Sequence, residues 1–91
     1  MKSTNEAVKQ INAAARRNGW DIVAASVSLA SDGARAVVMV KRDRAQLGRE
    51  YSTHEFAHGG FFWGHYDLTE GDARADYVAR SGHAFGERYA Y

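Results

Sequence analysis

The chain has 91 residues, a net charge of +1 and no cysteine. This length predicts one domain over residues 1–91 and excludes folds such as the (β/α)8 barrel, which need about 250 residues. The lack of cysteine excludes disulfide scaffolds, zinc ribbons and thiol nucleophiles.

The first predicted element is a helix over residues 4–18. Ser3 and Glu6 have the spacing of a capping box at its start. A stripe of apolar residues then follows the helical period: Ala7, Val8, Ile11, Ala14 and Ala15. Gly19 is typical of a helix end, and we expect Trp20 to fold back on the helix as its apolar contact.

A hairpin is predicted to follow the helix. Apolar and polar residues alternate over 23–29, which is typical of a half-exposed strand. The turn chemistry of 31–33 separates this strand from a Val-rich run over 34–40. Because apolar residues fall on both sides of 34–40, we expect this strand to be central in its sheet.

A basic connection is predicted over residues 41–49, and a second hairpin after it. The strands of this hairpin are expected at 51–56 and 61–66, with a turn at 57–60. Four cations of the connection form a candidate partner-binding set: Lys41, Arg42, Arg44 and Arg49.

The last predicted element is a helix over residues 70–81, ending at Gly82. Thr69 and Asp72 form its expected cap, and the pairs Glu70–Arg74 and Asp76–Arg80 have the favourable i,i+4 order. Its expected inward residues are Ala73, Tyr77 and Val78. In the tail over 83–91, which lacks periodicity, Phe85, Tyr89 and Tyr91 are candidates to dock on the body.

This order of elements, α-β-β-β-β-α, predicts an α+β fold. We expect a single antiparallel sheet of about four strands with the helices packed on one face.

The string His54-Glu55-Phe56-Ala57-His58 matches H-E-x-x-H. On a helix this spacing places two zinc ligands on one face and a general base between them. The third-ligand candidates are His65, Asp67 and His83. A zinc-dependent hydrolase with His54, His58 and His65 as ligands is therefore one hypothesis.

The residues around this string favour a strand instead of a helix. Aromatic and β-branched residues precede it, and Gly59-Gly60 follow it at once. If Phe56 pairs with Phe61, His54 lies beside Trp63 and diagonal to His65, while Glu55 points to the opposite face. We therefore expect no catalytic residue, no metal and no cofactor.

The stretch Gly59-Gly60-Phe61-Phe62-Trp63-Gly64-His65-Tyr66-Asp67-Leu68-Thr69 is followed by Ala73, Asp76, Tyr77 and Arg80. It resembles the C-terminal half of small, functionally unassigned proteins of bacteriophages and prophages. In that group a W-G-H-Y strand leads into a helix with an A-x-x-D-[FY]-x-x-R pattern. The resemblance covers about residues 59–80 and implies a phage accessory protein without assigned catalytic residues.

The leading hypothesis is a non-enzymatic phage accessory protein that binds a host protein complex. Its most concrete form is an anti-CRISPR-type inhibitor of host defence in the bacterial cytoplasm. Residues 1–20 show no signal-peptide pattern, which agrees with that location. Trp63 and Tyr66 are the candidate aromatic anchors, because Trp and Tyr are enriched at binding hot spots.

Two other hypotheses use the same surfaces. A nucleic-acid-binding domain would use the basic connection with Arg16 and Arg17. The cations are not clustered enough for a typical nucleic-acid interface, however. A homodimer would pair through an exposed sheet edge.

Overall fold

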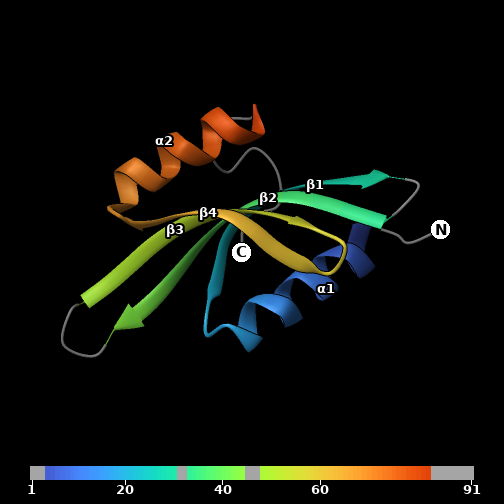
Figure 1. The fold of residues 1–91 in the computed structure, drawn as a ribbon, viewed down its shortest axis with the longest axis horizontal. Helices are drawn as coiled ribbons and strands as arrows, with labels where there is room; N and C mark the ends of the chain where they lie inside the picture. The colour runs from blue at the N-terminus through green and yellow to red at the C-terminus, as the bar shows by residue number, and fades with distance from the viewer. Residues whose placement is uncertain (1–3, 31–32, 45–47, 83–91) are drawn as a thin grey trace.

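The computed structural model describes residues 4–30, 33–44 and 48–82 (Figure 1). The elements in chain order are α1 (Thr4–Arg17), β1 (Asp21–Ala30), β2 (Gly33–Arg44), β3 (Gly48–Ala57), β4 (Gly60–Leu68) and α2 (Glu70–Ser81). The predicted α+β fold and the order α-β-β-β-β-α are confirmed.

The four strands form one antiparallel meander in the order β1-β2-β3-β4. The two helices lie on opposite faces of this sheet (Figure 1), so the prediction that both pack on one face is wrong. The reason lies in β2, where both sides carry apolar residues. Val38 and Val40 belong to the α1 core and Met39 to the α2 core. A strand that is apolar on both sides needs a cover on each face.

The α1 layer holds the larger core. The predicted helical stripe is buried except for Val8, which is partly buried, and Ile11 is 2 % exposed against Val27, Val38 and Phe56 of the sheet. The end of α1 also follows the prediction, since Gly19 has φ 76° and the Trp20 N–H donates to the Ala15 carbonyl at 2.9 Å. Trp20 packs against this core as expected.

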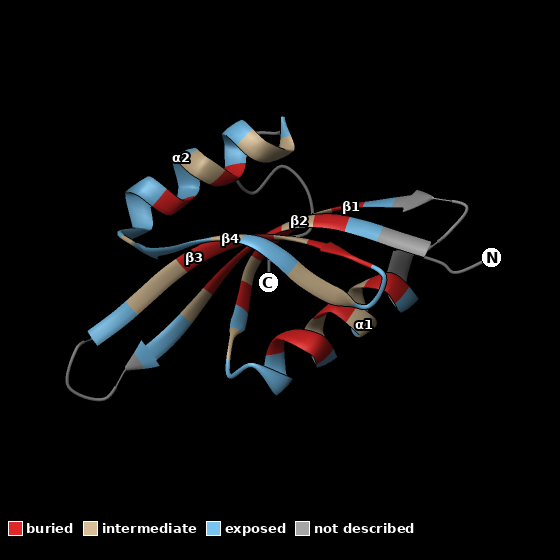
Figure 2. Cartoon of the chain, viewed as in Figure 1, coloured by how far each residue is buried: buried red, intermediate tan, exposed pale blue. Residues whose placement is uncertain are grey.

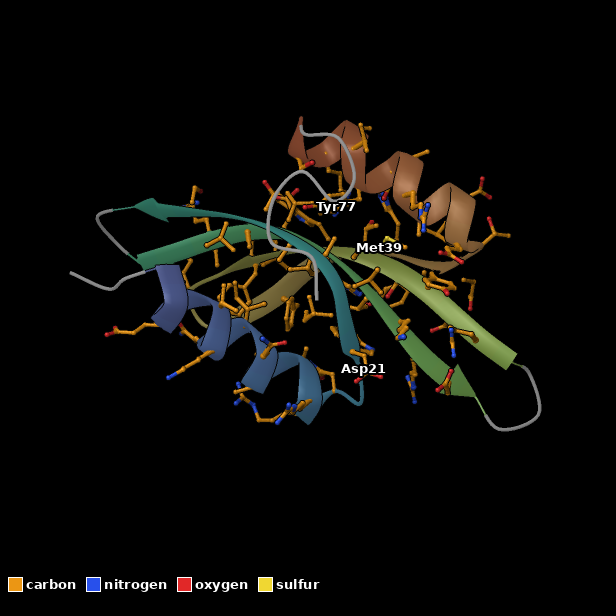
Figure 3. The ribbon with its side chains drawn as sticks, turned by 180° about the vertical axis from the view of Figure 1, so that it is seen from behind. Asp21, Met39 and Tyr77 are labelled. Atoms are coloured by element: carbon orange, nitrogen blue, oxygen red, sulfur yellow. The ribbon has the colours of Figure 1, made fainter. Side chains whose placement is uncertain are left out.

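The α2 layer is smaller and centres on Tyr77 and Met39, which face each other between α2 and the sheet (Figure 3). Thr69 caps the helix as predicted, accepting from the Asp72 N–H at 3.1 Å. Gly82 ends the helix in the left-handed conformation. Val78 was predicted to point inward but is exposed, because Ala73 and Tyr77 already fill the narrow contact with the sheet.

Within the predicted basic connection over 41–49, the described residues 41–44 and 48–49 belong to two paired strands. β2 continues to Arg44, and Asp43 pairs with Arg49 across the hairpin. The pairing of β1 with β2 ends at Lys41, and the pairing of β4 with β3 ends at Tyr51. Beyond these points β2 and β3 project past their neighbours as an exposed two-stranded extension (Figure 2). Oppositely charged residues face each other across this extension, Arg42 opposite Glu50 and Asp43 opposite Arg49, and such pairs stabilise neighbouring strands.

Some predictions fall outside the described residues. These are the Ser3 cap, the turn at Ser31-Asp32, and the tail with His83, Phe85, Tyr89 and Tyr91. The side chain of Arg44 also lies outside the described set, although its backbone belongs to β2.

Candidate functional site

The H-E-x-x-H string lies on a strand and a turn. Residues 54–57 end β3, and His58 occupies the exposed turn with φ 54°. His54 stacks on Trp20 on the α1 side, whereas Glu55 lines a cavity on the other side with Phe62. The helical geometry that the zinc hypothesis needs is therefore missing. Within residues 4–30, 33–44 and 48–82, no group of three His, Cys, Asp or Glu residues could hold a metal ion.

β4 contains two irregularities that decide where its side chains point. Phe56 pairs with Phe61 as predicted, but the register then shifts so that Thr53 pairs with His65. A second shift brings Tyr51 opposite Leu68. Each shift adds one residue to β4, as in a β-bulge. The added stretches contain Trp63 and Asp67 at φ 53° and 57°, left-handed values that are uncommon outside glycine.

The first bulge overturns the expected grouping of histidines. His65 pairs with Thr53 and contacts Asp76 of α2, so it lies on the α2 side of the sheet. His54 lies on the α1 side against Trp20. A one-residue slip in register moves every later side chain to the other face. The two histidines are therefore separated by the sheet and cannot ligate one ion.

His54 is buried in an aromatic cage. Its side chain is 1 % exposed, and its ring stacks on Trp20 with a centroid distance of 4.2 Å and an interplanar angle of 21°. The Ser52 hydroxyl lies 2.9 Å from Nε2, and Tyr66 meets the ring edge-on. Burial lowers the pKa of His54 from 6.5 to about 4, helped by the charges of Arg80 and His65. His54 is therefore a neutral core residue at pH 7.

Gly64 leaves the space that the His54 ring occupies. A Cβ at this position would lie 2.7 Å from His54 Cε1 and Nδ1 and from Tyr66 Cε2. We expect Gly64→Ala to lower the free energy of unfolding by about 1–3 kcal/mol, because the ring must move in a packed site. Urea unfolding at pH 7 measures this. Gly60→Ala is the matched control, since its Cβ meets nothing within 4 Å. Equal stability of the two variants would contradict the packing argument.

A polar cluster joins α2 to β3 and β4. One carboxylate oxygen of Asp76, Oδ2, accepts from the buried Thr53 hydroxyl. It also accepts from His65 Nδ1 at 2.8 Å and lies 3.5 Å from Arg80 Nε. Arg80 in turn donates from Nη2 to the Trp63 carbonyl at 2.6 Å. Burial alone would raise the pKa of Asp76, but these three donors outweigh it and the pKa is lowered. The cluster holds the bulge at Trp63 against α2.

The edge strand β4 carries the exposed aromatic side chains of the described part of the chain. Trp63 is 70 %, Tyr66 55 % and Phe62 37 % exposed. The rings of Phe62 and Trp63 meet at 5.0 Å in an edge-to-face contact. We call Phe62 and Trp63 the β4 aromatic surface, whereas Tyr66 lies on the α1 side of the sheet against His54. Trp63 and Tyr66 were predicted from the sequence as aromatic anchors, whereas Phe62 was not.

The predicted basic set lies apart from this surface, at the tip of the β2–β3 hairpin. Arg49 Nε contacts Asp43 Oδ1 at 2.9 Å, and Arg42 lies opposite Glu50 in the strand register. The hydrogen bond to Asp43 raises the pKa of Arg49 further above its usual range. Lys41 is half-buried and lies opposite Asp21 in the strand register. The two predicted contact surfaces are therefore separate in the fold.

The polar cluster was not predicted as a unit. The Asp76–Arg80 pair was recognised as a helical i,i+4 pair, and the structure confirms its contact. Its other partners are Thr53 of β3 and His65 of β4, and the first bulge turns His65 toward Asp76. The alternation of a regular strand contains no signal for that shift.

No protein-family profile matches this chain, and comparisons with curated proteins and with solved structures give no significant match. Neither described helix is long and apolar enough to cross a membrane.

Proposed function

We propose that this chain is a non-enzymatic binding protein that contacts a protein partner through the β4 aromatic surface. The observation that carries the proposal is Trp63, a large apolar side chain with 70 % exposure on an edge strand. Trp and Tyr supply much of the binding energy at protein interfaces. The Trp63 side chain buries little within the chain itself, so stability does not account for it.

The backbone at Trp63 adds support. A bulky residue at φ 53° is held against its own preference, at a cost on the order of 1 kcal/mol. Arg80 holds this conformation through its hydrogen bond to the Trp63 carbonyl, and Asp76 positions Arg80. Residues with strained backbone conformations cluster at the functional sites of proteins. The fold thus presents the indole to solvent at a defined place.

Binding through side chains fits this edge better than strand addition. A strand that adds to a sheet edge needs a regular row of free backbone groups. The two bulges interrupt that row at Trp63 and Asp67. Bulged edges disfavour pairing with another strand, including the same edge of a second copy. The homodimer hypothesis through this edge therefore receives no support from its geometry.

The resemblance of residues 59–80 to phage-encoded proteins suggests the setting. It covers β4 and most of α2, the elements that carry Trp63, Asp76 and Arg80. We therefore propose a host protein complex as the partner and inhibition of a host defence system, CRISPR–Cas in its most concrete form, as the role.

The first test compares Trp63→Ala with the wild type in affinity capture from a bacterial host lysate and with purified CRISPR effector complexes. We expect the affinity for the partner to fall by at least about 30-fold, the size of a hot-spot loss. The free energy of unfolding should change by only about 0.5 kcal/mol, because the side chain is exposed. Biolayer interferometry and urea unfolding measure the two quantities.

Val78→Ala is the matched control, since Val78 is an exposed apolar residue outside the β4 aromatic surface. It should bind like the wild type. A partner retained equally by Trp63→Ala and Val78→Ala would overturn the proposal.

A further inference from the structure

We infer that a cavity beside the β4 aromatic surface is a subsite for a carboxylate side chain of the protein partner. The inference deepens the proposed function and rests on it. It starts from the space between the last turn of α2 and the α2 face of the sheet. A cavity of about 270 Å³ lies there, lined among others by Ser26, Ser28, Arg35, Phe62 and Arg80.

Arg80 is the centre of this argument. Its side chain is 12 % exposed and is fixed at two nitrogens, Nε beside Asp76 and Nη2 on the Trp63 carbonyl. The third nitrogen, Nη1, is buried and has no hydrogen-bond partner. A buried guanidinium donor left unpaired is costly and rare in native proteins. Because Nη1 is closed to solvent, a ligand acceptor removes that cost only when the guanidinium group turns toward the cavity that Arg80 lines.

The lining around Arg80 selects the chemistry of the acceptor. Arg35 brings a second positive charge, and Ser26 and Ser28 bring hydroxyl groups from β1. Glu55 is the one acid among the described lining residues, and Asp76, outside the lining, offsets the charge of Arg80. Guanidinium groups bind carboxylates with matched, charge-assisted hydrogen bonds. With these two acids close by, the site suits a singly charged carboxylate better than a doubly charged phosphate.

Phe62 makes the cavity continuous with the β4 aromatic surface. Its ring lines the cavity and also contacts the Trp63 ring at 5.0 Å. A partner segment that packs on Trp63 therefore reaches the cavity over Phe62. An Asp or Glu on that segment would enter the cavity and accept from Arg80, which gives the interface its specificity.

The test titrates the isolated protein with acetyl-Gly-Asp-Gly-amide at constant ionic strength and follows backbone amides by NMR. We expect saturable shifts at Ser26, Ser28 and Ser81, and no saturable shift with the Asn counterpart. Arg80→Gln should weaken binding of the Asp peptide by at least about tenfold. Arg74→Gln is the matched control, because Arg74 contacts Glu70 on the exposed side of α2.

Arg80 also supports the fold, so Arg35→Gln provides a second variant at an exposed position. It should weaken binding of the Asp peptide several-fold. Equal shifts with the Asp and Asn peptides, or undiminished binding in Arg35→Gln and Arg80→Gln, would overturn the inference. Inorganic phosphate is a third probe, and binding of phosphate in place of the Asp peptide would overturn the carboxylate assignment.

The two proposals fail separately in this design. Trp63→Ala should leave peptide binding unchanged while it removes the partner. Peptide binding without any effect of Trp63→Ala on the partner would remove the proposed function and keep the subsite. The reverse result would remove the subsite alone.

Discussion

The free energy of unfolding is expected to fall by about 3 kcal/mol as the pH is lowered from 6.5 to 4, because of His54. Burial against Trp20 lowers the pKa of the folded state to about 4, whereas the unfolded chain has the ordinary value of 6.5. The unfolded state therefore binds the proton first, and acid favours unfolding. The stabilisation is complete above pH 6.5 and is lost as the pH falls through 6.5 toward 4.

Urea unfolding at a series of pH values between 7 and 4 measures this slope. His54→Gln should flatten it, because the amide does not titrate, although the variant is less stable at pH 7. His58→Asn is the matched control, since His58 lies in the exposed turn and Asn tolerates its positive φ. A wild-type curve that stays flat between pH 6.5 and 5 would contradict the burial of a neutral His54.

Asp76→Ala is expected to lower the free energy of unfolding at pH 7 by about 3 kcal/mol. The substitution removes the acceptor of the fully buried Thr53 hydroxyl and the counter-charge of Arg80, whose side chain is 12 % exposed. Both groups then stay buried without their charged partner. Hydrogen bonds to a charged group contribute more than neutral ones, and a broken half-buried pair costs more than an exposed one.

The control for this measurement is Glu70→Ala. Glu70 forms a contact of the same i,i+4 type with Arg74 at 2.9 Å, but both side chains are half-exposed. Exposed helical pairs contribute about 0.3–0.5 kcal/mol, so this variant should be nearly as stable as the wild type. A double-mutant cycle of Asp76→Ala with Thr53→Val separates the hydroxyl contact from the rest. Equal losses for Asp76→Ala and Glu70→Ala would show that the cluster does not hold α2.

The proposed binding role of the β4 aromatic surface depends on this cluster. Asp76 orients Arg80, and Arg80 holds the carbonyl of Trp63 and lines the cavity beside Phe62. The residues that stabilise the edge of the sheet and those proposed to contact the partner are thus linked through a single guanidinium group. Asp76→Ala should therefore reduce partner affinity as well as stability, whereas Trp63→Ala should reduce affinity alone.

Local patterns in the sequence determined the elements of this protein. The 3–4 spacing of Ala7, Ile11 and Ala14 defined α1, and the cap at Thr69 with the stop at Gly82 defined α2. The pairing of Phe56 with Phe61 and the central place of β2 were also predicted. These features depend on interactions within a few residues or across one tight turn, so short-range periodicity is enough to predict them.

Only the tertiary structure decided which face each later side chain of β4 takes. Each bulge adds one residue and reverses the alternation, and this separates His65 from His54 and brings His65 to Asp76. The placement of the helices on opposite faces also depends on contacts between distant segments. The two apolar sides of β2 are covered by α1 and α2, which lie at opposite ends of the chain. Contacts between distant segments have no period in the sequence, so the polar cluster, the cavity and the exposed place of Trp63 arise from packing of the whole fold.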